Sequence, residues 1–328
     1  MLNISKRRTL LGAGALVAAL GVAIGVPTAG NAAPTSVTVA VAGDIACDPG
    51  VAPNASELDP NFNGGAGAAN FCHESQTANL IKTMNPYKVF AMGDTQYNRA
   101  STEDYAASYN PTWGAFKSKT VPVIGNHEYL TYSPKAGGYF AYFGGLAGSA
   151  PNDYRSFSIG LASSTWHVVV INSECTSIDN GAGCAVGSPQ YNWLKSDLAS
   201  HANLCTVVLS HRPRWASDAW ASSDIAPLVD LMSQYHVDLL LAGHAHNYER
   251  FYTQTSAGVS SSTGIREIIV GTGGQDMRPF GTTAKNSSLR KTNIFGVLKL
   301  TLSSGSYSWS YVADPSTPFT DSGSGTCH

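Results

Sequence analysis

The chain is poor in charged residues and has no run of basic residues. Charged residues make up 13% of the 328 residues, and the formal net charge is −2. Three positive charges, Lys6, Arg7 and Arg8, stand near the N-terminus, and the rest of the chain carries a net charge of −5. Surfaces that bind nucleic acid or anionic membranes are rich in Lys and Arg. The composition therefore disfavours a nucleic-acid platform, and no feature implies a partner protein.

After residue 26 the sequence also has no apolar run long enough to span a membrane. The first apolar run, Leu10 to Val26, follows the basic residues and precedes small residues that end in Gly30-Asn31-Ala32. This order is typical of a bacterial secretory signal, and 17 apolar residues lie at the lower limit for crossing about 30 Å of hydrocarbon. We therefore expect residues 1–32 to be a signal peptide and the mature protein to be secreted. Arg7-Arg8 also fits the twin-arginine pattern, with an ordinary signal as the alternative.

The six cysteines include no pair at the two-residue spacing of a structural zinc site. All of them follow the expected signal, and an even number in an exported chain favours disulfides. Nearness in sequence predicts the pairs Cys47–Cys72 and Cys175–Cys184, and Cys205–Cys327 is the remaining pair. Other pairings stay open from the sequence alone.

Short runs of β-branched and apolar residues predict buried strands. They lie at 37–42, 88–92, 121–124, 167–171, 206–209, 237–242 and 265–270. Helical patterns at 74–84, at 226–235 and after Ser188-Pro189 lie between them. The alternation predicts an α/β architecture with largely parallel central strands and an antiparallel finish at 295–302 and 307–312. With 43% hydrophobic residues in the chain, residues 33–328 are expected to form a single domain.

Five predicted strands are followed by polar residues that could bind metal. The blocks are Gly43-Asp44, Gly93-Asp94-Thr95-Gln96-Tyr97, Gly125-Asn126-His127-Glu128, Ser210-His211 and Gly243-His244-Ala245-His246. In open α/β sheets ligands collect at the carboxyl ends of the strands, so we expect these blocks to converge. They supply carboxylate, phenolate, amide and imidazole groups, a set suited to iron, zinc or manganese. Paired ions in such a site can hold a phosphate and acidify a water molecule.

The five blocks, in this order, are similar to those of the calcineurin-like metallophosphoesterase superfamily. Tyr97 and the run Gly243-His244-Ala245-His246-Asn247-Tyr248-Glu249-Arg250 resemble the purple acid phosphatase branch. The likeness spans Asp44 to Arg250 and implies an α/β fold, a four-layer sandwich of two mixed β-sheets flanked by helices. Further stretches, Gly43-Asp44-Ile45-Ala46-Cys47-Asp48-Pro49 and Asp321-Ser322-Gly323, resemble a compact bacterial secreted form of that branch. The extra β-rich domain of plant members is not expected here.

The resemblance also implies two metal ions and their ligands. The implied ligands are Asp44, Tyr97 and His246 for an iron ion, Asn126, His211 and His244 for a second ion (zinc, iron or manganese), and Asp94 as the bridge. Two positions after Asp44 the family has Gly, or His in other branches, whereas this chain has Ala46. Because alanine cannot ligate a metal, Tyr97 must complete that side.

His127 differs from these ligands because its neighbour Asn126 already fills the metal position. The resemblance gives His127 the role of a general acid or a phosphate contact. Arg212 could bind a phosphate oxygen as a fixed cation, with a surface arginine as the alternative. The turn at 271–274 is interpreted as structural. The same interpretation is given to His73, His167, His201, His236 and His328, which match no block.

These features predict a secreted dinuclear-metal phosphatase that hydrolyses small phosphate monoesters. Hydroxide activated by the metals would attack phosphorus, and His127 would protonate the leaving alcohol. A phosphodiesterase or nucleotidase with the same metals is the alternative, because loops around the site decide the substrate. A serine/threonine protein phosphatase is disfavoured because this chain has Asn98-Arg99-Ala100 where that group has Asp-Arg-Gly. A non-catalytic exported binding protein is disfavoured because all seven implied ligands are present.

Overall fold

Two mixed β-sheets form the centre of the fold. The computed structural model describes residues 33–51, 59, 61–131, 135–202, 204–217 and 219–328, so the expected signal peptide lies outside the described residues. One sheet has the strand order β13-β12-β11-β1-β2-β3 and the other β10-β8-β9-β7-β6-β5-β4. The strands are β1 (Ser36–Ala42), β2 (Lys88–Ala91), β3 (Thr120–Pro122), β4 (Arg155–Gly160), β5 (Thr165–Val170), β6 (Cys205–Leu209), β7 (Leu239–Ala242), β8 (Tyr248–Phe251), β9 (Arg266–Val270), β10 (Ser287–Lys291), β11 (Gly296–Ser303), β12 (Ser306–Ala313) and β13 (Ser322–Thr326).

The middle of each sheet is parallel. In the six-stranded sheet β1 pairs with β2 and β2 with β3 in parallel. In the seven-stranded sheet β5, β6, β7 and β9 are parallel neighbours. The last strands, β11 to β13, pair antiparallel. The predicted parallel centre and antiparallel finish are therefore confirmed.

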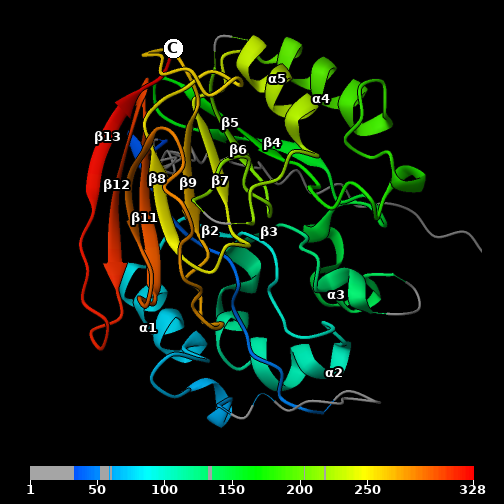
Figure 1. The fold of residues 1–328 in the computed structure, drawn as a ribbon, viewed down its shortest axis with the longest axis vertical. Coiled ribbons are helices and arrows are strands. Elements are labelled where there is room, and N and C mark those ends of the chain that lie inside the picture. The colour runs from blue at the N-terminus through cyan, green and yellow to red at the C-terminus, as the bar shows by residue number, and fades with distance from the viewer. Residues whose placement is uncertain (1–32, 52–58, 60, 132–134, 203, 218) are drawn as a thin grey trace, which may run out of the picture. The chain divides into compact units, whose positions relative to one another are not determined.

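Helices cover the outer faces of both sheets. They are α1 (Glu74–Met84), α2 (Thr102–Asp104), α3 (Gly137–Phe143), α4 (Pro189–Ser200) and α5 (Ala226–Gln234). Figure 1 shows α4 and α5 side by side above the sheets and α1, α2 and α3 below them. The start of α4 follows its sequence signal, because Ser188 Oγ accepts a hydrogen bond from Tyr191 N and Pro189 occupies the first turn. The four-layer α/β sandwich implied by the resemblance is confirmed.

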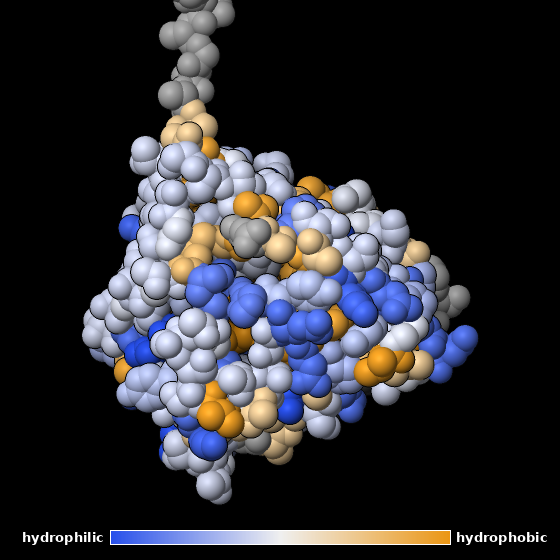
Figure 2. Space-filling view, turned by 90° about the horizontal axis from the view of Figure 1, so that it is seen from above, coloured by the Kyte–Doolittle hydropathy of each residue, from blue (hydrophilic) through white to orange (hydrophobic). Residues whose placement is uncertain are grey.

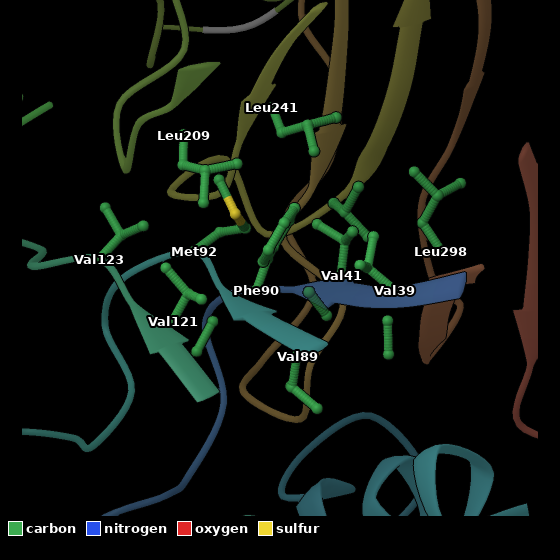
Figure 3. Packing of buried hydrophobic residues seen from close by; sticks show 14 of the residues in the cluster. Val39, Val41, Val89, Phe90, Met92, Val121, Val123, Leu209, Leu241 and Leu298 are labelled. Atoms are coloured by element: carbon green, nitrogen blue, oxygen red, sulfur yellow. The ribbon is translucent and has the colours of Figure 1, made fainter. Parts of the chain in front are cut away.

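The alternation of side chains along each strand divides the core into two layers. Val207 and Leu209 of β6 belong to the layer between the sheets, whereas Val208 belongs to the layer under α4 and α5. Figure 3 shows Leu209 opposite Phe90 of β2, while Val89 points to the other face of its sheet. These side chains are fully buried, and each such burial contributes about 1.5–3 kcal/mol. The two sheets are thereby held face to face, which fixes the strand ends relative to one another.

Three disulfides link distant segments. They join Cys47 to Cys72, Cys175 to Cys184 and Cys205 to Cys327, the pairs expected from the sequence. The first links the segment after β1 to the start of α1, and the third links β6 to the residue after β13.

The surface is mainly polar on the face shown in Figure 2, where hydrophobic residues form small separate patches. Within the described part of the chain, no helix has the length and apolar character required to span a bilayer.

Candidate metal centre

Seven side chains that follow strand ends meet at one place, and we call them the metal-centre cluster. They are Asp44 after β1, Asp94 and Tyr97 after β2, Asn126 after β3, His211 after β6, and His244 and His246 after β7. Both sheets therefore contribute to the cluster. All of these residues are buried apart from Asn126, which is partly exposed. The convergence expected from the sequence is present.

The backbone at the cluster adopts conformations that non-glycine residues rarely take. Asp44, Asp94, His244 and His246 have φ values of 59°, 46°, 68° and 51°. Such left-handed residues cost on the order of 1–3 kcal/mol each and concentrate at functional sites. Here each one turns the chain sharply at the end of a strand, which directs the side chain into the cluster. Gly93 precedes Asp94 with φ +83°, and a Cβ there would lie 2.4 Å from His211 Nδ1.

One half of the cluster surrounds the Tyr97 hydroxyl. Its oxygen lies 3.0 Å from Asp44 Oδ1, 3.1 Å from Asp94 Oδ2 and 2.9 Å from His246 Nε2. His246 Nδ1 donates to the Asp276 carbonyl at 2.7 Å, so Nε2 of the neutral ring carries a lone pair. A cation among these four atoms could replace the protons that otherwise link them. Carboxylate, phenolate and imidazole together suit an iron ion.

The other half surrounds His211 Nε2. His211 Nδ1 donates to the Met92 carbonyl at 2.9 Å, which leaves a lone pair on Nε2. This atom lies 3.2 Å from Asn126 Oδ1, 3.3 Å from Asp94 Oδ2 and 3.1 Å from His244 Nδ1. A second cation could replace the protons at this point, because Asn126 Oδ1, Asp94 Oδ2 and the imidazole nitrogens of His211 and His244 all lie close together. Histidines that bind metal commonly donate their other N–H to a carbonyl, as His211 and His246 both do.

Asp94 joins the two halves. Its Oδ2 faces both the Tyr97 hydroxyl and His211 Nε2, and its Oδ1 accepts a hydrogen bond from His127 N at 2.9 Å. One carboxylate oxygen therefore points at both candidate cation positions, as a bridging ligand would. The chemistry of the donor set fits two metal ions of the iron, zinc or manganese type.

The carboxylates of the cluster favour the positively charged form of two of its histidines. Burial lowers the pKa of His211, but the nearby Asp94 carboxylate outweighs burial and raises that pKa to about 10. Burial also lowers the pKa of His246, but Asp44 and Asp276 outweigh burial and raise that pKa to about 9. His244 behaves differently, because burial and the charges of His211 and Arg212 lower its pKa. The carboxylates thus create a negative potential that attracts cations.

His127 lies beside the cluster. Its Nδ1 donates to the Asn98 carbonyl at 2.7 Å, and its Nε2 lies 3.9 Å from Asp94 Oδ2. Its ring is 4.2 Å from the Tyr97 ring, and its side chain is 20% exposed. Asn98 is itself held through its backbone N–H, which donates to Asp48 Oδ2 at 3.3 Å. The bond to Asn98 fixes the tautomer, so Nε2 is the ring atom available to the site.

Arg212 forms a bidentate ion pair with the carboxylate of Glu174. Its Nε and Nη2 donate to the two oxygens of Glu174 at 2.8 Å and 2.9 Å. Its Nη1 lies 2.8 Å from His244 Nε2. Because a guanidinium only donates hydrogen bonds, His244 Nε2 is the acceptor in this contact. Arg212 is therefore adjacent to the cluster, and its side chain is 29% exposed.

Several supporting residues were not assigned roles from the sequence. The buried Glu128 carboxylate accepts hydrogen bonds from the N–H groups of Asp94, Thr95 and Gly125 and so clamps two strand ends together. Its position within the Gly125 to Glu128 block was the only signal for this role. Gly271 packs against the cluster, since a Cβ there would lie 2.8 Å from Asp44 Oδ2. The turn at 271–274 is thus a close approach to the cluster as well as a turn.

The fold and this cluster define the class of the protein. A four-layer α/β sandwich with a mixed oxygen and nitrogen cluster at its strand ends is the metallophosphatase architecture. The family model described as "Calcineurin-like phosphoesterase" matches residues 37–248, and the chain belongs to this family.

Curated relatives support the purple acid phosphatase branch, and a solved structure has the same fold. The chain is 27% identical over 220 residues to phosphoenolpyruvate phosphatase of Allium cepa, covering 59% of this chain and 44% of the relative. It is 30% identical over 202 residues to purple acid phosphatase 1 of Ipomoea batatas, covering 54% and 40%. The chain thus spans less than half the length of these relatives. Purple acid phosphatase PPD1 of yellow lupin (Lupinus luteus) has the same fold, with a TM-score of 0.61 and 20% identity over 89% of this chain and 54% of that chain.

Proposed function

We propose that the protein is an exported phosphomonoesterase with a dinuclear metal centre of the purple acid phosphatase type. The observation that carries the proposal is the convergence of carboxylate, tyrosine, amide and imidazole atoms at two points that share Asp94 Oδ2. Asp44, Tyr97 and His246 would hold iron. Asn126, His211 and His244 would hold a second ion, zinc, iron or manganese, and Asp94 would bridge the pair.

Metal ions bound there would offset the negative charge of a phosphate and make a water molecule acidic enough to supply the nucleophile. The protein's own part is to fix the ligand geometry. The left-handed backbone at four ligands, the carbonyl partners of His211 and His246, and the Glu128 clamp all serve this purpose. A buried, pre-oriented site of this kind avoids reorganisation during the reaction.

His127 is the proposed general acid. The Asn98 carbonyl holds the proton of Nδ1, so the proton given to a leaving alcohol would come from Nε2. This atom lies on the side of Asp94 and is partly open to solvent. A positioned acid of this type contributes on the order of 10² to 10⁴ in rate.

Arg212 is the proposed phosphate contact. If His244 bound a metal through Nδ1, its neutral ring would carry the proton on Nε2, which could then not accept a hydrogen bond from Arg212 Nη1. Glu174 would keep its hold on Nε and Nη2. Nη1 would thereby be released to donate to a phosphate oxygen, and charge-assisted hydrogen bonds of this kind are strong.

Export is part of the proposal. Residues 1–32 would be the signal peptide, residues 33–328 the catalytic domain, and the three disulfides suit an oxidising compartment. N-terminal sequencing of protein recovered from the culture medium should give Ala33 as the first residue. Protein that stays inside the cell with Met1 intact would contradict export.

The test of the catalytic proposal combines metal analysis with rates for an aryl phosphate monoester and its diester analogue. We expect about two transition-metal ions per chain and a higher kcat/KM for the monoester. Preference for the diester would identify a phosphodiesterase with the same centre. Two bound metals without hydrolysis of either ester would identify a binding protein, and absence of metal would refute the proposal.

A further inference from the structure

A surface cavity of about 570 Å³ is lined in part by two residues that contact the metal-centre cluster. It lies between the segment that follows β6, which contributes Ser217, Ala219 and Trp220, and the segment that follows β9, which contributes Arg278 and Phe280. Ligand pockets in proteins have volumes of about 300–1,000 Å³. The cavity therefore has room for the part of a small substrate that extends beyond the scissile phosphate.

Trp220 connects the cavity to the cluster. Its ring stands edge-on to the His244 ring at a centroid distance of 5.1 Å. The residue is 38% exposed, so part of the indole is open to solvent although it touches a proposed metal ligand. An exposed indole of this kind offers a planar surface on which another ring can stack.

Arg278 supplies a positive charge to the same cavity. Its guanidinium carbon lies 4.6 Å from the centre of the Trp220 ring, and its side chain is 26% exposed. Its backbone N–H donates to the His246 carbonyl at 3.0 Å, which ties it to the cluster. Asp276 is a loose partner at 4.0 Å, and the same carboxylate contacts His246 Nδ1 at 2.9 Å. The Arg278 charge is thus only weakly paired and can meet a second anion.

We propose that Trp220 and Arg278 form a leaving-group subsite for phosphorylated substrates whose leaving group carries a planar ring and a further negative charge. Nucleoside diphosphates have this chemistry. The terminal phosphate would lie at the metal-centre cluster, the second phosphate at Arg278 and the base against Trp220. A small alkyl phosphate would leave the subsite empty. This inference rests on the proposed phosphatase function and adds the class of its substrates.

Three substrates separate the contributions of the ring and of the charge. Ribose 5-phosphate and AMP both release a ribose 5′-hydroxyl and differ in the base, whereas ADP releases AMP, which adds a second phosphate to the leaving group. Trp220→Ala should lower the ratio of kcat/KM for AMP to kcat/KM for ribose 5-phosphate about tenfold, within the range known for ring stacking. Arg278→Gln should lower the ratio for ADP to AMP about tenfold, because it removes a charge-assisted hydrogen bond.

Conservative and remote variants control the experiment. Trp220→Phe and Arg278→Lys should restore most of each ratio. Tyr87→Ala removes another exposed aromatic side chain, 53% exposed, next to the start of β2 and so away from the strand ends of the cluster. It should leave both ratios unchanged.

Calorimetric binding of ADP separates failure of the subsite from failure of the proposed function. Wild-type protein that hydrolyses none of the three esters, yet binds ADP about tenfold more tightly than either Trp220→Ala or Arg278→Gln, would support the subsite and refute the phosphatase function. Equal losses for all three substrates would show that the two residues only support the metal centre. That result, or unchanged ratios and unchanged ADP affinity, would overturn the subsite.

Discussion

The seven-stranded sheet carries two groups of histidine and aspartate that resemble each other in composition and differ in construction. One is the part of the metal-centre cluster that follows β6 and β7. The other, the His167 cluster, consists of Ser156 on β4, His167 on β5, and Asp197 and His201 on or next to α4. The ligand atoms of His167, Asp197 and His201 lie within 4.8 Å of one another, as do those of Asp94, His211 and His244. Nearness of such side chains alone therefore does not define a metal site.

The difference lies in the directions of the lone pairs. The rings of His167 and His201 stack at 3.9 Å with an interplanar angle of 14°, so their in-plane lone pairs run in parallel planes. The rings of His211 and His244 cross at 70°, which lets their nitrogens converge. In the His167 cluster each carboxylate oxygen of Asp197 also meets a donor. Asp197 accepts from His167 Nε2 and from Ser156 Oγ, both at 2.6 Å.

The backbone gives the same contrast. Asp44, Asp94, His244 and His246 of the metal-centre cluster have positive φ, whereas Ser156, His167, Asp197 and His201 do not. Regular strand and helix are sufficient to build a hydrogen-bonded group. Convergence of several lone pairs on one point required strained turns, which a fold retains when the site has a use.

The largest effect is expected from Asp94→Asn. This change removes the charge shared by both candidate cation positions, so we expect at most one metal per chain and a loss in kcat/KM on the order of 10⁴-fold, because metal ions supply several kcal/mol of transition-state stabilisation. The matched control is Asp197→Asn in the His167 cluster, which should keep both metals and full activity. Elemental analysis and initial rates, measured on the same preparations of both variants, test this prediction. Equal metal loss in both variants would remove the distinction between the clusters.

His127→Ala should give the next largest effect, and the effect should depend on the substrate. Loss of the general acid should slow an alkyl phosphate by about 10² to 10⁴, while an aryl phosphate with a good leaving group should be slowed much less. Metal content should stay normal because Asn126 is untouched. His201→Ala in the His167 cluster is the control and should slow neither ester. An equal loss for both esters would make His127 a phosphate contact, and a loss of metal would make it a structural part of the centre.

Tyr97→Phe tests a feature that the His167 cluster lacks altogether, a tyrosine hydroxyl. Iron-loaded wild-type protein should absorb visible light through charge transfer from the Tyr97 phenolate to ferric iron, and the variant should lose this band. Tyr142→Phe removes a hydroxyl that bonds to Asn110 instead and should keep the colour. A colourless iron-loaded wild type, or a variant that keeps the band, would show that Tyr97 is not a ligand. A manganese or zinc pair would then explain the centre better.

The parts of the fold that follow hydrophobic periodicity could be predicted from the sequence. Helix α1 has the predicted bounds, and the buried parallel strands lie where apolar runs predicted them. Strand β13 was missed because its sequence Ser-Gly-Ser-Gly-Thr has no apolar residue. It pairs with β12 because its glycines leave room for aromatic rings, and a Cβ on Gly323 would lie 2.3 Å from Trp309. The reason for the pairing therefore lies in the aromatic residues of β12 and cannot be read from the sequence of β13.

The metal-centre cluster could likewise be predicted only in part from the sequence. Ligand candidates could be found because each one directly follows a predicted strand, and the topology brings strand ends together. Glu174, which holds Arg212, and Asp276, which contacts His246, are 38 and 30 residues away from their partners in sequence. No local pattern connects them. Such contacts depend on how loops fold over the strand ends, and periodicity carries no information about this.

The smallest effect is expected from Asp197→Asn, and it concerns stability alone. The variant should lose about 2 kcal/mol of unfolding free energy at pH 7, the range for hydrogen bonds to a charged group. The amide oxygen of an asparagine could still accept from His167 Nε2, and the amide NH2 could donate to Ser156 Oγ. Both bonds would then join uncharged acceptors and donors of the 197 side chain, and such bonds are about half as strong as those to a carboxylate.

The pH dependence of this loss identifies its source. Burial alone would raise the pKa of Asp197, but the hydrogen bonds from His167 and Ser156 outweigh burial and hold it below the usual value of 3.8. A carboxyl with a lower pKa in the folded state stabilises the fold above its unfolded-state pKa, and this contribution disappears as the pH falls through the folded-state value. The difference between wild type and variant in urea unfolding should thus be largest near neutral pH and should shrink below about pH 4. A difference that stays constant between pH 7 and pH 3 would mean that the charge of Asp197 is not what stabilises the cluster.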